Sequence, residues 1–176
     1  MGSYGECIPI ILQMMDRALI SHCLQTADLA EMVSKGMELD TKLLKVAATV
    51  HDIGKIYVAP LILNKEGKLS ESEREAVDLH AYYGYRILQE MNVDDRVCNI
   101  VIYHHGRDKP ALREKPAYTE EVALYAGIIR TVDAYDALTS DRPYRVGYSP
   151  AEAISMMKSE GIYRNDIVEM LEKKFI

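Results

Sequence analysis

His51 and Asp52 are adjacent in the sequence and are followed by Ile53-Gly54-Lys55. An imidazole nitrogen is a good transition-metal ligand, and a carboxylate has two oxygens with which it can bridge two ions. Because neighbouring side chains leave an α-helix about 100° apart, this pair can converge on one metal centre only near a helix end. Gly54 is a residue at which such a helix is expected to stop. A lone His-Asp pair is usually a surface turn, so the interpretation as metal ligands depends on the Ile-Gly-Lys that follows.

The other four histidines lie at comparable places in the chain. His104 and His105 form a tandem pair at the end of a helix expected over 94–103, while His22 and His80 flank apolar helical stretches. A single histidine there is more often a satisfied core residue than a ligand, and an exposed tandem pair beside a loop is an ordinary alternative. However, all five histidines fall at helix ends or on apolar flanks, which scattered surface histidines would not need to do. As a set they favour a shared metal centre.

Asp133 provides a candidate carboxylate for the same chemistry. It follows Ala126 and Ile129 at helical spacing, so it should lie on a buried helix face. An unpaired buried charge is very costly, and a carboxylate there therefore needs a partner. A metal ion and an arginine are the two partners to consider.

The elements that must position these residues are helices. Apolar residues recur at three- and four-residue steps over 20–33 and 43–50, and further helices are expected over 80–91 and 165–173. Residues 106–117 are expected to form a loop, and only 55–63 is ambiguous. Since no alternating strand pattern, repeat or linker is present, the prediction is an all-α bundle. Helix starts are predicted at the N-cap residues Asp40, Ser70, Asp94, Thr119 and Ser149.

Composition limits the classes of protein to which the chain can belong. With 176 residues, 48% of them apolar, it is expected to form one domain over 1–176 with a sizeable core. A formal net charge of −6 argues against a nucleic acid polymer as partner. No apolar run reaches the roughly 20 residues of a membrane span, and no signal peptide is evident. Cys7, Cys23 and Cys98 form no CxxC pair, so we expect reduced, buried thiols and a cytoplasmic protein.

On these motifs the sequence resembles the HD superfamily of metal-dependent phosphohydrolases. The most similar branch is that of the HD-GYP phosphodiesterases, which hydrolyse cyclic dinucleotides, chiefly cyclic di-GMP. The resemblance extends from about Leu19 to the last helix and implies the HD-domain helical bundle. The matching segments are HDIGK at 51–55, HAYYG at 80–84, the pair His104-His105, and VDAYDALTSDRPYR at 132–145, which is the most specific.

The resemblance also implies a metal site and a reaction. A water shared by two divalent ions about 3.5–4 Å apart would be activated as hydroxide for attack on phosphorus. Iron, manganese, nickel and zinc all suit such ligands. One ion would be held by His22, His51, Asp52 and Asp133, and the second by Asp52, His80, His104 and His105, with Asp52 bridging.

Three basic residues are the candidates for binding substrate. Lys55 is expected to bind a phosphate of a small nucleotide; its alternative is a solvated lysine after a helix end. Arg142 and Arg145 are further candidates, although Asp141 offers Arg142 an equally good structural partner.

The chain departs from the HD-GYP pattern at several positions. Gly106 stands where a glutamate normally follows the histidine pair, and no Gly-Tyr-Pro loop comes after it. Ala18 stands where three-metal members carry a glutamate, which favours two metals. The leading hypothesis is a cyclic dinucleotide phosphodiesterase. The alternatives are the same chemistry on another nucleotide or phosphate ester, and a catalytically silent nucleotide-sensing module. Homo-oligomers and a signalling-protein partner also stay open.

Overall fold

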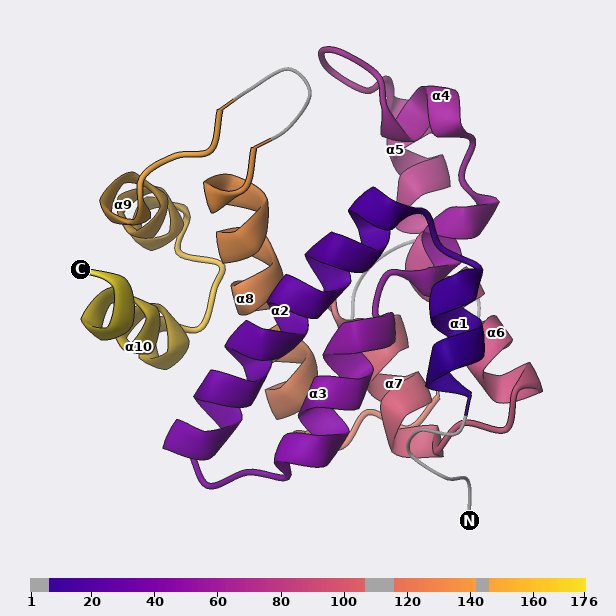
Figure 1. The fold of residues 1–176 in the computed structure, drawn as a ribbon, viewed down its shortest axis with the longest axis horizontal. Coiled ribbons are helices and arrows are strands. Elements are labelled where there is room, and N and C mark those ends of the chain that lie inside the picture. Colours follow the sequence, from indigo (N-terminus) through magenta and orange to yellow (C-terminus); the bar gives the residue numbers. More distant parts are fainter. Residues whose placement is uncertain (1–6, 107–115, 142–145) are drawn as a thin grey trace.

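The computed structural model describes residues 7–106, 116–141 and 146–176, and these contain helices and no strand (Figure 1). The all-α prediction is therefore confirmed. No helix in the described part of the chain is both long and apolar enough to cross a membrane. The elements are α1 (Ile8–Gln13), α2 (Arg17–Gly36), α3 (Thr41–Val50), the 3-10 helix η1 (Ile53–Tyr57), α4 (Pro60–Leu63), α5 (Glu71–Asp78), α6 (His80–Glu90), α7 (Asp95–Tyr103), α8 (Glu120–Thr139), α9 (Pro150–Glu160) and α10 (Asn165–Phe175).

Side chains predicted as caps begin five of these helices. Asp40, Asp94 and Thr119 each accept a hydrogen bond from a backbone N–H of the first turn. Each such cap contributes about 1 kcal/mol to helix stability. The ambiguous stretch 55–63 contains the end of η1 and the short helix α4, with Val58 and Ala59 between them, and α1 is a helix that the apolar pattern did not predict. Reciprocal capping boxes join Ser70 to Glu73 and Ser149 to Glu152.

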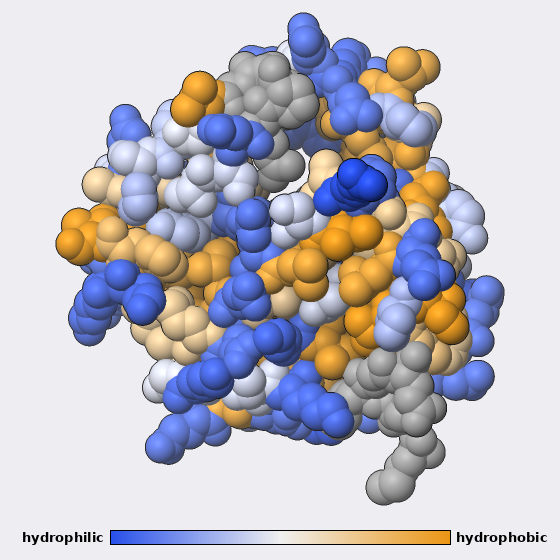
Figure 2. Space-filling view, viewed as in Figure 1, coloured by the Kyte–Doolittle hydropathy of each residue, from blue (hydrophilic) through white to orange (hydrophobic). Residues whose placement is uncertain are grey.

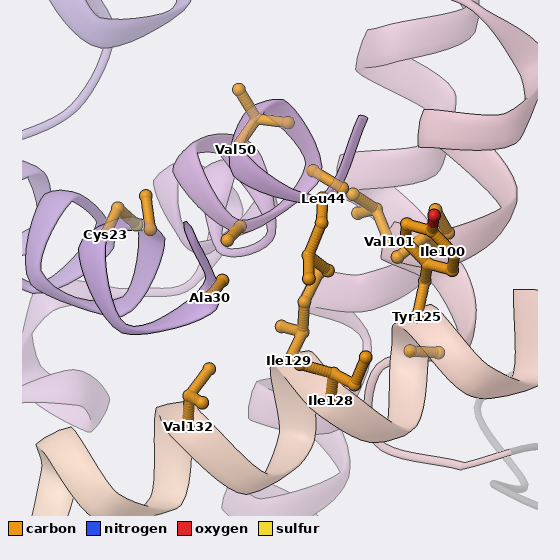
Figure 3. Packing of buried hydrophobic residues seen from close by; sticks show 14 of the residues in the cluster. Cys23, Ala30, Leu44, Val50, Ile100, Val101, Tyr125, Ile128, Ile129 and Val132 are labelled. Atoms are coloured by element: carbon orange, nitrogen blue, oxygen red, sulfur yellow. The ribbon is translucent and has the colours of Figure 1, made fainter. Parts of the chain in front are cut away.

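Four helices enclose the main core, and α9 and α10 pack on α8. Helix α2 packs on α3 and α8, while α7 packs on the same two helices. Figure 3 shows their side chains meeting, among them Leu44 of α3 and Ile129 of α8, both completely buried. Cys23 and Cys98 are buried, as predicted, whereas Cys7 is half-buried. This packing places the middle of α8 beside the end of α3 and the end of α7.

Gly54 lets η1 approach α6 much more closely than any other residue would. A Cβ atom at this position would lie 1.9 Å from the carbonyl oxygen of His80 and 2.5 Å from the backbone nitrogen of Gly84. Both obstacles are backbone atoms, so they cannot rotate away. The glycine therefore sets the distance between the segment that carries Asp52 and Lys55 and the first turn of α6.

We predict that Gly54→Ala destabilises the protein strongly, because the two backbones must separate. Overpacking of this kind costs about 1–3 kcal/mol or more, which for a chain of this length corresponds to a decrease of at least about 2 °C in melting temperature. Gly36→Ala is the matched control, since its Cβ would meet only the flexible end of Met170. Circular dichroism melts of the two variants measure the difference. Equal melting temperatures would refute the close-approach explanation.

Candidate metal centre

The structure brings all seven predicted ligands into one cluster. His51 is the C-cap of α3 and His104 is the C-cap of α7, so both lie at helix ends, as the sequence predicted. Five of the seven are at least 90% buried. The full set is His22 of α2, His51 and Asp52 after α3, His80 at the start of α6, His104 and His105 after α7, and Asp133 of α8.

One half of the cluster combines two imidazoles with two carboxylates. The Nε2 atom of His22 lies 3.0 Å from Oδ1 of Asp133 and 3.5 Å from Oδ2 of Asp52. The Nε2 atom of His51 lies 3.5 Å from Oδ2 of Asp52 and 3.7 Å from Oδ1 of Asp133. His51 is completely buried, and this Nε2 has no hydrogen-bond partner among the described residues. Ligand atoms of His22, His51 and Asp133 all lie within 4.8 Å of one another.

The other half is a group of three imidazoles. Nε2 of His80 lies 3.2 Å from Nε2 of His104 and 3.1 Å from Nε2 of His105. The same nitrogen is 3.2 Å from Oδ1 of Asp52. The two carboxylate oxygens of Asp52 thus face different halves, and a single side chain links them.

The hydrogen bonds of these rings show that a cation fits the cluster. A backbone carbonyl only accepts, so an Nδ1 atom bonded to one carries the proton, and Nε2 of the neutral ring holds a lone pair. In the three-imidazole half, the Nε2 lone pairs of His80 and His104 then point at each other across 3.2 Å, and a divalent metal would stabilise that arrangement. Three rings donate in this way to the carbonyl three residues earlier: His51 to Ala48 (2.8 Å), His80 to Val77 (2.5 Å) and His104 to Val101 (2.6 Å).

Burial opposes protonation of the histidines in both halves, and the carboxylates reverse this effect in only one of them. It lowers the pKa of His104 well below its usual value, and the neighbouring His105 adds to the effect. Burial and then His80 lower the pKa of His105 to about 3, so both rings are neutral at pH 7, as ligation requires. At His22 burial also opposes protonation, but hydrogen bonds, first to Asp133, outweigh it and raise the pKa to about 10. The carboxylates therefore favour positive charge in their half.

The predicted phosphate ligand Lys55 lies at the edge of the cluster. Its ammonium group forms an ion pair with Oδ2 of Asp52, and a quarter of the side chain is exposed. Burial opposes ionisation of Asp52, but Lys55 and then His51 hold the pKa of this carboxyl well below its usual range. The other two candidates for substrate binding, Arg142 and Arg145, lie outside the described residues.

Two residues of the centre were not assigned to it from the sequence. The carboxylate of Asp136 accepts a 2.6 Å hydrogen bond from Nδ1 of His22, which directs Nε2 of that ring toward Asp52 and Asp133. Asp136 follows Asp133 by three residues, so the two share a helix face, and this spacing could have revealed it. The thiol of Cys23, expected only to fill space, lies within 4.8 Å of ligand atoms of His51 and Asp52.

We predict that Asp136→Ala weakens metal binding without preventing folding. The His22 ring loses the hydrogen bond that orients it, and the loss of such a partner typically costs 10- to 100-fold in metal affinity. Competition with a chelator measures the dissociation constant. Asp28→Ala is the control, because this carboxylate lies on α2, the helix that carries His22, but is exposed and among the described residues pairs with Lys45. Equal affinities of the two variants would show that Asp136 does not support the centre.

Comparison with known sequences identifies relatives of the chain. The model of the HD domain family matches residues 19–138, which include all seven candidate ligands. A cyclic di-GMP phosphodiesterase of Pseudomonas aeruginosa is 34% identical over 150 residues, which are 83% of this chain and 36% of that protein. A 3'3'-cGAMP-specific phosphodiesterase of Vibrio cholerae is 30% identical over 163 residues, 89% of this chain and 35% of that protein. The chain thus spans about a third of the length of these relatives.

A solved structure has the same fold. The HD domain of the L. monocytogenes phosphodiesterase PgpH in complex with cyclic-di-AMP matches with a TM-score of 0.69 at 18% identity. The match covers 94% of this chain and 93% of that one, and it confirms the predicted HD-domain bundle. Since the family model also covers more than half of the sequence, the chain belongs to the HD domain family.

Proposed function

We propose that this chain is a metal-dependent phosphodiesterase that hydrolyses a cyclic dinucleotide, and that residues 1–176 act as one domain. The observation that carries the proposal is the position of Asp52, whose two oxygens face two separate groups of buried ligands. The names of the relatives support the substrate class, since they act on cyclic di-GMP and 3'3'-cGAMP. The three free cysteines suit a reducing compartment, and we propose the cytoplasm.

The site would hold two divalent ions, and the candidate metals are iron, manganese, nickel and zinc. Ions so placed lower the pKa of water and neutralise charge on phosphoryl oxygens. We assign His22, His51 and Asp133 to one ion, His80, His104 and His105 to the other, and Asp52 to both.

The side chains of the protein prepare this site in two ways. Hydrogen bonds from Nδ1 hold His51, His80 and His104 with Nε2 directed into the cluster, so little reorganisation is needed when ions bind. Lys55 adds a positive charge at the exposed edge, where a phosphate can reach it. We propose that Lys55 binds the scissile phosphate, and that Arg142 and Arg145 contact other parts of the substrate.

A second candidate keeps the chemistry and changes the substrate. Gly106 has a φ angle of +105°, a backbone conformation that residues with a side chain rarely adopt. The HD-GYP branch carries a glutamate at this position, so the backbone after His105 must follow a different path here. This observation favours another nucleotide or phosphate ester as the alternative substrate.

We predict that the metal-loaded protein converts cyclic di-GMP to its linear dinucleotide or to GMP. Asp52→Asn should lower turnover by at least about 100-fold, because one amide cannot replace a carboxylate that serves both ligand groups. Liquid chromatography of the products with cyclic di-GMP, cyclic di-AMP, 3'3'-cGAMP and linear nucleotides measures this, and Asp28→Asn is the control. Turnover of linear nucleotides alone would favour the second candidate. Binding without any product, in protein shown to contain metal, would instead identify a sensing module.

A further inference from the structure

A cavity of about 240 Å³ opens directly beside the metal centre. It lies between the start of α2 and the segment formed by η1 and α4. Lys55 forms part of its wall, and the ammonium group of this residue pairs with Asp52. Leu19, on the opposite wall, precedes His22 by one turn of α2. A ligand whose phosphate lies at Lys55 would therefore extend into this cavity.

The lining combines six apolar residues with three polar or charged ones, and the size of the cavity suits one ring system. Pockets for whole drug-sized ligands have volumes of about 300–1,000 Å³, so this cavity accommodates part of a nucleotide and not a complete cyclic dinucleotide. In the view of Figure 2, apolar side chains gather on this face over α1 and the first turns of α2. The apolar residues that line the cavity are Met14, Leu19, Ile56, Val58, Pro60 and Leu63.

The remaining two lining side chains both present hydrogen-bond acceptors. Asp16 is the N-cap of α2, and its Oδ1 accepts from the backbone N–H of Leu19 at 2.9 Å. Its second oxygen has no partner among the described residues and remains available. Asn64 donates its Nδ2 to the carbonyl of Pro60 at 3.0 Å, which leaves the amide oxygen as an acceptor. A matching ligand carries hydrogen-bond donors at the edge of an apolar ring.

We propose that this cavity binds a guanine base of the substrate, with Asp16 as the residue that selects it. The N1–H and the 2-amino group of guanine are adjacent donors, and one carboxylate can accept from both. Adenine places the acceptor N1 at that position, which the negative charge of Asp16 repels. Asp16 is exposed and water competes for its oxygens, so the preference rests on this difference between two donors in guanine and an acceptor in adenine. The inference rests on the proposed function, since it places the phosphate of the same nucleotide at Lys55.

Asp16→Asn tests the selection while preserving the fold. The amide oxygen can still cap α2, but the free carboxylate oxygen is replaced by an amide donor. Hydrogen bonds to a charged group contribute about 1.5–3 kcal/mol, so the preference for guanine should decrease by about tenfold or more. Asp40→Asn is the matched control, because Asp40 caps α3 in the same way through the N–H of Leu43.

Two measurements on the metal-loaded chain keep the inference separate from the proposed function. Calorimetry with GMP and AMP gives the base preference without turnover, and kcat/KM for cyclic di-GMP and cyclic di-AMP gives it during the reaction. We expect wild type and Asp40→Asn to prefer guanine and Asp16→Asn to lose that preference. Equal binding of GMP and AMP by wild type, or an unchanged preference in Asp16→Asn, would overturn the inference. An Asp16-dependent preference for GMP without turnover of any cyclic dinucleotide would support the base site and refute the proposed function.

Discussion

Asp52 carries a carboxylate that is 1% exposed, and a buried charge of this kind is tolerated only where opposite charges or hydrogen-bond donors surround it. His51 and Lys55 are its neighbours in the sequence, whereas the fold brings His22 of α2 and His80 of α6 to it from distant parts of the chain. These elements must all meet at one point. Two features bring them together. One is the packing of α2, α3, α7 and α8, and the other is the close contact of η1 with α6 at Gly54.

Carbonyl groups at helix ends orient three of the histidine rings. The last carbonyls of a helix have no partner within that helix, and they also form the negative end of its dipole. The carbonyls of Ala48, Val77 and Val101 lie in the last turns of α3, α5 and α7, and each accepts the Nδ1 proton of a histidine. The same groups thus orient the rings and make the surroundings favourable for cations. This explains why His51, His80 and His104 lie at helix ends.

Sequence reasoning recovered what is encoded locally. N-caps such as Asp40 and Ser149 act over one turn, so their positions can be read directly, and the HDIGK and tandem-histidine segments carry their chemistry in adjacent residues. Contacts made by the tertiary fold were less accessible. The bond between Asp136 and His22 joins residues 114 positions apart, and the contact between Gly54 and His80 depends on how two helices pack. The spacing of Asp136 from Asp133 indicates a shared helix face, but the bond to His22 and the contact of Gly54 become visible only in the fold.

If the buried carboxylate of Asp52 links two metal-binding groups, the number of metal ions bound per chain depends on this residue. Plasma mass spectrometry on anaerobically purified and metal-reloaded protein should find about two divalent ions per wild-type chain. Asp52→Ala should retain at most one, with an unchanged helical circular dichroism spectrum. Wild-type protein that remains free of metal after reloading would contradict the account. An Asp52→Ala variant that still holds two ions would show that Asp52 does not link the two groups.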